Sequence, residues 1–231
     1  MSETLKQVFP GTASMNSKSA KSAPQSDATV IEQQMESLFA TLLQLIDKHK
    51  SLVVHLVAAT PGEGVSTLAR TLAVTAGQRS WCKVALLELV AEEGSSRGTA
   101  SDGATLLEQF ADDGTADFEQ ISIAGAALSI GRLSDTGAAR PRLDTLREFY
   151  AWARARFTLV IVDCPPIMRA PDSAVLCSLA DGTILVVEAD RTRVPVVQRA
   201  SETLAAGGAK ILGVVLNKRE DLIPSFLYRF I

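Results

Sequence analysis

The sequence predicts an α/β protein with a doubly wound, mainly parallel sheet and helices on both faces. Five apolar runs recur along the chain, reading LVVHLVAA, KVALLELV, FTLVIVD, GTILVVEA and AKILGVVLN. They are almost continuously apolar, without polar alternation, as the strands of a parallel sheet covered on both faces must be. Segments of helical periodicity lie between several of these runs. Such strand–helix–strand repetition favours right-handed crossover units in three layers.

The N-terminal part of the chain differs from the rest in composition. Residues 1–28 are rich in Ser, Lys and small side chains. They have little apolar surface to bury, so we expect a flexible tail. Residues 29–231 are expected to form one α/β domain, because no internal repeat or second domain is visible. The tail lacks the apolar core of a signal peptide, and no apolar stretch approaches the roughly 20 residues that span a bilayer. We therefore expect a cytoplasmic protein without a transmembrane segment.

A long helix is predicted to open the domain, over residues 30–49. Thr29 and Glu32 form a capping-box pattern at its start. Apolar residues then recur at helical spacing and form one face: Ile31, Met35, Leu38, Phe39, Leu42, Leu43 and Ile46. Packing of this face on the sheet is the favoured interpretation, and docking on a membrane-bound partner is the alternative.

Three further helices are predicted at residues 66–79, 143–156 and 194–206. The last has Pro195 near its start and Gly207 just past its end, which are the favoured positions of these residues. Residues 92–140 are rich in Gly, Ser and Asp. There we expect a short helix in GATLLEQF and one short strand in ISIAGAALSIG.

Composition and charge exclude some classes of function. Apolar residues make up 47% of the chain, which fits a packed domain. The net charge of −3 gives no electrostatic basis for nucleic-acid binding. Cys82, Cys164 and Cys177 are odd in number and lack metal-ligand spacing. They are interpreted as reduced, mostly buried thiols of a reducing compartment.

The first apolar run ends in the stretch AATPGEGVST, residues 58–67. A phosphate-binding loop needs glycines, inward N–H groups, a helix N-terminus, a lysine for the phosphates and a Ser or Thr for magnesium. The chain has Val65 where the lysine belongs. The remaining predicted nucleotide-binding positions are Pro61, Gly62, Glu63, Gly64, Ser66 and Thr67. A Gly-rich strand-to-helix turn without a ligand is the alternative interpretation.

Two carboxylates follow apolar strands at the edge where open α/β sheets bind ligands. Asp163 ends LVIVD, and such an aspartate holds magnesium or its water in phosphate-loop proteins. We predict Ser66 and Asp163 as the magnesium ligands if the ion binds. Glu88 ends the second strand and is either a further metal-side carboxylate or an ordinary strand-end charge. The corresponding alternative for Asp163 is a cap on the turn before Pro165.

These motifs resemble those of the bacterial tyrosine kinases (BY-kinases) of exopolysaccharide synthesis and export, which are related to the MinD and ParA ATPases. The resemblance runs from about residue 30 to the C-terminus. The family's loop is Pro-Gly-Glu-Gly-Lys-Ser-Thr, and the match at Glu63 is specific to the kinase branch. VDCPP followed by Asp172 resembles the family's second nucleotide motif. The resemblance also implies that Asn217, in ILGVVLNKR, faces the base.

The chain departs from the family pattern at four features. Val65 replaces the loop lysine, and Glu88 and Val90 stand where the family has Asp-x-Asp. Met35 and Leu38 replace the arginines of the family's oligomer-forming helix. A C-terminal tyrosine cluster is not found in the ending IPSFLYRFI, which has one tyrosine. This joint loss predicts a domain that is not a catalyst. Should it be active, Glu88, Asp163 and Asp172 would be its catalytic residues.

The predicted function is therefore a catalytically degenerate BY-kinase-like scaffold or regulator. The resemblance implies a membrane polysaccharide co-polymerase, a chain-length determinant, as its partner, with the protein peripheral at the inner membrane. ATP or ADP and Mg binding are expected to be weak or lost, and a homo-oligomer is left open. The FLYRFI ending offers a second apolar patch. Two alternatives are an atypical ATP-dependent tyrosine autokinase or ATPase, and a MinD/ParA-type positioning ATPase. No obvious replacement cation is found among Arg70, Lys83, Arg191 and Arg193.

Overall fold

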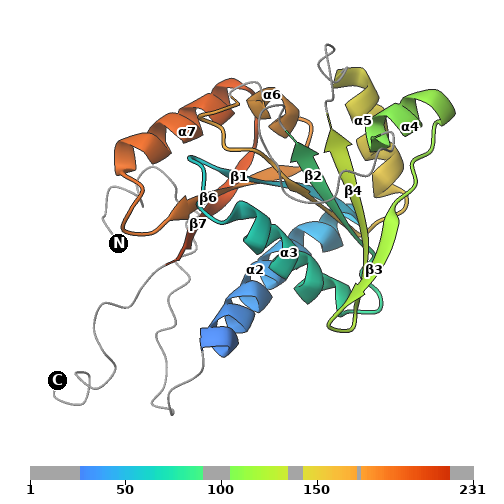
Figure 1. Ribbon diagram of the computed structural model, residues 1–231, viewed down its shortest axis with the longest axis horizontal. Coiled ribbons are helices and arrows are strands. Elements are labelled where there is room, and N and C mark those ends of the chain that lie inside the picture. Colours follow the sequence, from blue (N-terminus) through green and yellow to red (C-terminus); the bar gives the residue numbers. More distant parts are fainter. Residues whose placement is uncertain (1–26, 91–104, 135–142, 171–172, 219–231) are drawn as a thin grey trace.

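The computed structural model describes residues 27–90, 105–134, 143–170 and 173–218, and it is built around one seven-stranded sheet (Figure 1). The strands are β1 (Leu52–Ala58), β2 (Val84–Val90), β3 (Glu119–Ile123), β4 (Ala126–Ser134), β5 (Leu159–Asp163), β6 (Gly182–Glu188) and β7 (Ile211–Asn217). The helices are α2 (Asp27–His49), α3 (Val65–Gly77), α4 (Leu106–Asp113), α5 (Leu143–Arg154), α6 (Ser173–Cys177) and α7 (Val194–Ala206).

The strand order is β3-β4-β2-β5-β1-β6-β7, and every neighbouring pair except β3–β4 is parallel. β1 therefore lies in the interior, between β5 and β6. All seven of its residues are buried. Chain order reverses across this central region, and ligands of open α/β sheets bind at such switch points. The predicted doubly wound, mainly parallel fold is confirmed.

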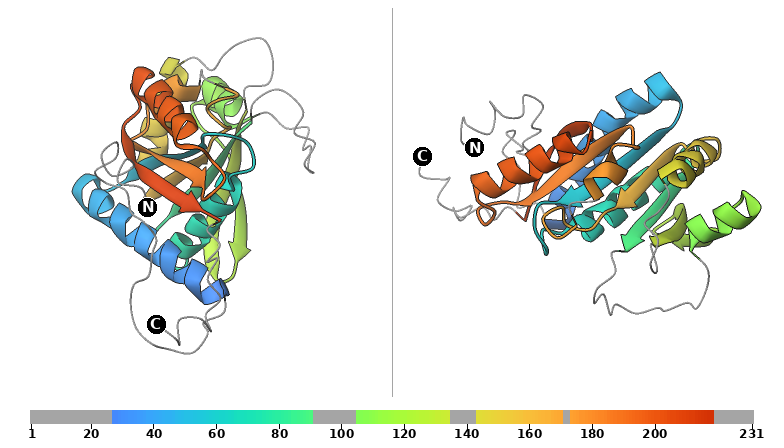
Figure 2. Two further views of the ribbon diagram at one scale, coloured as in Figure 1. Left: turned by 90° about the vertical axis from the view of Figure 1, so that its left-hand side faces the viewer. Right: turned by 90° about the horizontal axis from the view of Figure 1, so that it is seen from above.

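Helices cover both faces of the sheet, because alternate residues of each buried strand point to opposite sides. On one side, Val54 and Leu56 pack in a core with α2 and α3. On the other, Val53 and Val57 pack in a core with α4, α5, α6 and α7. Figure 2 shows α2 and α7 on opposite sides of the strands. The three layers match the sequence prediction.

The region after β2 differs from its prediction. ISIAGAALSIG is not one strand: it contains most of β3, a turn and the first part of β4. Ala124 and Gly125 at the turn have φ values of 49° and 80°, so both central residues are in the left-handed region that a tight hairpin needs. β3 pairs antiparallel with β4, which itself continues the parallel sheet beside β2. The five-residue helix α6 was also not predicted.

Helix α2 uses its apolar face inside the domain. Met35, Phe39, Leu42 and Ile46 are 1–4% exposed and belong to the core that α3 shares. The Arg79 guanidinium also lies over the Phe39 ring, and its central carbon is 4.6 Å from the ring centroid. Packing on the domain, the favoured prediction, is thus the observed role of these side chains. The predicted start of this helix is wrong: α2 begins at Asp27, so residues 27 and 28 are helical and Thr29 lies inside the helix instead of capping it.

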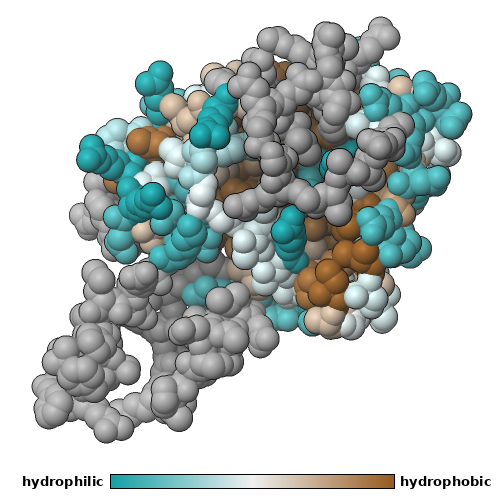
Figure 3. Space-filling view, in the orientation of Figure 1, coloured by the Kyte–Doolittle hydropathy of each residue, from teal (hydrophilic) through white to brown (hydrophobic). Residues whose placement is uncertain are grey.

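No helix in the described ranges is long and apolar enough to cross a membrane. Exposed large apolar side chains include Trp81, before β2, and Ile123, at the end of β3, which are 54% and 48% exposed. Figure 3 shows hydrophobic surface gathered toward the β3–β4 hairpin. The Gln78 side chain donates to the Ala124 carbonyl at 3.3 Å, so the end of α3 adjoins this hairpin turn.

Truncating the buried face of α2 is expected to destabilise the domain. Leu42→Ala removes a side chain that is 2% exposed, and we expect a loss of about 2–5 kcal/mol in the free energy of unfolding. Leu43→Ala, the same change at the next, half-buried residue, is expected to cost clearly less. Chemical denaturation of both variants measures the difference. Equal losses would contradict the packing described here.

Candidate functional site

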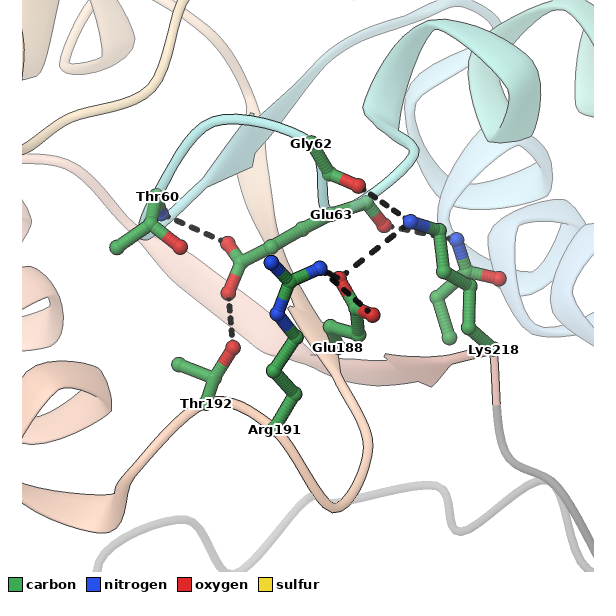
Figure 4. Close-up of polar contacts among 8 residues, drawn as sticks. Thr60, Gly62, Glu63, Glu188, Arg191, Thr192 and Lys218 are labelled. Carbon is green, nitrogen blue, oxygen red and sulfur yellow. Dashed lines mark hydrogen bonds and ion pairs between the residues drawn. The ribbon is translucent and has the colours of Figure 1, made fainter.

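The candidate site lies at one edge of the sheet, where the parallel strands reach their carboxyl ends. β1 ends at Ala58, and the loop that follows leads directly into α3. Asp163, Glu188 and Asn217 are the last residues of β5, β6 and β7. Parallel pairing brings these ends to the same edge, so residues far apart in sequence meet around the loop. Figure 4 shows the contacts that Glu188, Thr192 and Lys218 make around the loop.

Two glycines give the loop its path. Gly62 and Gly64 both have φ of 89°, a conformation that other residues adopt at a cost. A Cβ on Gly64 would also lie 2.3 Å from Nδ2 of Asn217, so this position has no room for a side chain. Gly64 is the N-cap of α3 and supplies no side-chain hydrogen bond to its first turn. The helix N-terminus thus keeps N–H groups available for an anion.

Glu63 holds the loop closed from within. Its side chain is only 1% exposed, unusual for a carboxylate. One carboxylate oxygen accepts the backbone N–H of Thr60 at 2.8 Å, and the other accepts the hydroxyl of Thr192, from the segment after β6. These contacts, visible in Figure 4, satisfy a buried acid and fix the loop against the β6–α7 connection.

The end of β7 binds the loop through two backbone carbonyls. The Asn217 amide donates to the Glu63 carbonyl at 2.8 Å. The Lys218 ammonium donates to the Gly62 carbonyl at 2.5 Å and lies 3.4 Å from a Glu188 carboxylate oxygen. Sequence reasoning missed Lys218, which follows the last strand and has no loop motif of its own. That Asn217 faces a base stays a prediction.

Val65, where the family's loop has lysine, begins helix α3. Its side chain is 7% exposed and belongs to the apolar core between the sheet and the α2–α3 layer. Valine has no donor or charge, so this position offers a phosphate its backbone N–H alone. The replacement is therefore accommodated as a core residue.

Ser66, Asp163 and Glu88 meet beside the loop. The Ser66 hydroxyl lies close enough to the Asp163 carboxylate to lower its pKa. Glu88 is the register partner of Asp163 across β2 and β5, and it accepts a hydrogen bond from Arg70 at 2.8 Å. Burial raises the pKa of Asp163, and the nearby Glu88 charge raises it further, while Ser66 and Arg70 act in the opposite direction. The predicted metal pair, Ser66 and Asp163, is thus brought together.

The arrangement fits magnesium better than it fits the nucleotide's outer phosphates. A hydroxyl and a carboxylate are the oxygen ligands that Mg²⁺ takes in phosphate-loop proteins, and Glu88 adds a second carboxylate nearby. The N-terminus of α3 can bind a phosphate, but Val65, at the position of the phosphate-binding lysine, has no group that could contact one. Pro61 and Thr67 lie exposed on the loop and first turn. Asp172, the remaining predicted catalytic residue, is outside the described residues.

The fold and the loop define a P-loop α/β protein, and comparison with known proteins narrows the class. No family model matches the chain. It is 36% identical over 70 residues to tyrosine-protein kinase CpsD of Streptococcus agalactiae, covering 30% of this chain and 31% of that protein. It is 28% identical over 177 residues to tyrosine-protein kinase YwqD of Bacillus subtilis, covering 72% of each. The chain thus spans less than a third of CpsD's length in that match.

A solved structure supports the same assignment of fold. The kinase domain of the Escherichia coli tyrosine kinase ETK superposes with a TM-score of 0.67 at 23% identity, covering 97% of this chain and 91% of that one. The protein is accordingly a homologue of the bacterial tyrosine-protein kinases, which confirms the resemblance drawn from its motifs.

Removing the buried charge of Asp163 should stabilise the domain at neutral pH. The pKa of Asp163 in the folded protein is raised above the ordinary value of 3.8. At a pH above this raised pKa, the ionised carboxylate lowers the stability of the folded state. At a pH below the ordinary value, the carboxyl is protonated in both the folded and the unfolded state and has no such effect. In magnesium-free buffer, Asp163→Asn should melt higher at pH 7, and each kcal/mol gained corresponds to about 2–4 °C. The advantage should shrink on acidification toward the ordinary value.

Thermal melts from neutral to acidic pH measure this difference, and Asp144→Asn is the control. The Asp144 side chain is 88% exposed and pairs with Arg147 on the surface of α5, so its replacement should change the melting temperature little. An Asp163→Asn variant that is less stable at pH 7, or whose advantage is unchanged at low pH, would contradict the electrostatic assignment.

Proposed function

We propose that this protein is a catalytically degenerate BY-kinase-like domain that acts as a cytoplasmic scaffold or regulator. Its partner would be a membrane polysaccharide co-polymerase in exopolysaccharide synthesis and export, which would hold it at the inner membrane. The observation that carries the loss of catalysis is Val65, buried in the apolar core where the family's loop has its phosphate lysine. Homology to tyrosine-protein kinases supports the class.

Loss of the lysine is expected to impair nucleotide binding less than it impairs phosphoryl transfer. A charge-assisted contact contributes about 1.5–3 kcal/mol, equivalent to about 10- to 100-fold in affinity. The backbone N–H groups of α3 and the Ser66–Asp163 pair remain, so weak Mg–nucleotide binding is compatible with the site. Phosphoryl transfer depends on neutralising the transferred group, and valine supplies no charge for that.

The loop's own contacts explain how it could keep its shape without catalysis. Glu63 bonds Thr60 and Thr192, and the end of β7 binds the Gly62 and Glu63 carbonyls. None of these contacts needs a phosphate. A loop stabilised in this way can serve as a structural or recognition element in a protein that no longer turns over ATP.

An active, atypical autokinase or ATPase is the second candidate, and Lys218 is the observation that favours it. Its ammonium reaches the loop at Gly62 and is 46% exposed at the side chain. Arg70 is a second nearby cation, although it pairs with Glu88. A MinD/ParA-type positioning ATPase is a third candidate with the same fold class. The Glu63 of the loop favours the kinase branch over it.

Nucleotide titration separates the scaffold from the enzyme. By calorimetry with MgATP and MgADP, we expect the wild-type chain to bind at least about tenfold more weakly than Val65→Lys, because the variant restores one charge-assisted contact. The stem of the introduced lysine can lie along the core while its ammonium reaches the loop. Val65→Met is the matched control, because it lengthens the side chain without adding a charge. We expect no ATP turnover by the wild-type chain.

Each other result has a defined meaning. Micromolar binding together with turnover by the wild-type chain would overturn the scaffold proposal, and loss of that turnover in Lys218→Met would identify the replacement cation. Recovery of hydrolysis in Val65→Lys would show that the other departures from the family pattern are not disabling. Tighter binding by Val65→Met would attribute the gain to packing.

The partner can be tested separately from the nucleotide. We expect a co-polymerase encoded beside this protein to co-purify with it from detergent-solubilised membranes. Asp163→Asn should be captured equally, because a scaffold does not need the magnesium carboxylate. Capture lost in Asp163→Asn would favour the enzyme. Failure of the wild-type chain to bind would shift weight to the positioning ATPase.

A further inference from the structure

Three side chains with metal-binding atoms meet inside the core, under the candidate nucleotide site. His55 lies on β1, Cys164 directly follows β5, and Cys177 is the last residue of α6. They are 0%, 3% and 0% exposed. Nδ1 of His55 is 3.4 Å from the Cys177 sulfur and 3.5 Å from the Cys164 sulfur, and the three ligand atoms lie within 4.8 Å of one another.

We propose that His55, Cys164 and Cys177 form a buried zinc site that ties the central strands to helix α6. Zinc binds imidazole nitrogen at about 2.0–2.1 Å and thiolate sulfur at about 2.3 Å. A tetrahedral angle between such bonds separates nitrogen from sulfur by about 3.6 Å. The two observed separations are close to this value, so an ion would need little rearrangement of the ligands.

The surroundings of His55 suit a metal ligand. Its second nitrogen, Nε2, is 2.7 Å from the Tyr150 hydroxyl, and Tyr150 is buried on α5. A ligating histidine usually donates its other N–H to an oxygen, which fixes the tautomer and the ring orientation. Donation from Nε2 to Tyr150 would leave the Nδ1 lone pair directed at the sulfurs. Tyr150 is thus a positioning residue for the site.

A buried hydroxyl adds a second observation. Thr183 is 0% exposed and is the register partner of His55 across β1 and β6. Its Oγ1 has no hydrogen-bond partner that meets normal geometry within the described residues, although it lies close enough to Cys177 to influence that thiol. Most buried polar groups are satisfied, so this one calls for an explanation. A bound ion, or water on it, would supply the partner.

The charge balance also favours zinc. Two thiolates and a neutral imidazole around Zn²⁺ sum to zero, so the filled site would place no net charge in the core. The two thiol protons leave to solvent as the ion enters. Sequence spacing gave no indication of the site, because its ligands come from three separate elements.

Metal content of the full, untagged chain tests the proposal. Protein expressed with added zinc and purified without chelator should hold about one Zn²⁺ per chain by elemental analysis. Refolding with Co²⁺ in place of zinc should give a thiolate-to-cobalt charge-transfer absorption. Cys164→Ser and His55→Gln should lose both signals. Cys82→Ser is the matched control, because Cys82 is also buried but lies in the core on the other face of the sheet.

Tyr150→Phe keeps the proposal testable if the ligand variants fail to fold. It preserves volume and should weaken zinc affinity by about 10- to 100-fold, as loss of an outer-shell partner does. A wild-type chain without zinc and without cobalt–thiolate absorption after refolding would overturn the proposal. So would a Cys164–Cys177 disulfide in the native protein, or zinc retained equally by Cys164→Ser.

Discussion

Much of this molecule depends on the complete burial of one strand, β1. Its seven residues are enclosed between β5 and β6 and between two helical layers. Every backbone group of such a strand must be paired within the sheet, which fixes its register on both sides. The register aligns Leu56 with Asp163 on one side and with Ile184 on the other. The position at which the loop leaves β1 is therefore set by the sheet and does not depend on which residues the loop contains.

The loop itself is stabilised by contacts that differ from those of catalysis. Glu63 is buried and bonded on both carboxylate oxygens, and Asn217 occupies the space beside Gly64. These contacts are all made between groups of the protein itself, and they fix the path of the loop. Val65 differs from Glu63 and Asn217, because its uncharged side chain is buried in the apolar core. A family motif can thus remain recognisable for reasons of folding while its reactive residue is replaced.

The sequence was sufficient for the features that follow from local pattern. Continuous apolar runs identified the parallel strands, and α7 has the predicted bounds because Pro195 and Gly207 mark its ends. The β3–β4 turn was missed because Ala124 adopts a positive φ that its residue type does not indicate. Lys218 and His55 were missed for another reason. Their importance comes from contacts across strands, and no spacing in the chain encodes those.

The two sites described here share a physical connection, which bears on what the domain could still do. Cys164 follows Asp163, and its backbone N–H donates to the Leu56 carbonyl at 2.9 Å. An ion held by Cys164 and His55 would thus fix the end of β5 to the middle of β1, next to the magnesium carboxylate. Burial raises the pKa of Asp163, and the neighbouring Ser66 acts in the opposite direction. The contacts that fix this edge do not involve the Val65 side chain, so they are compatible with the proposed scaffold role.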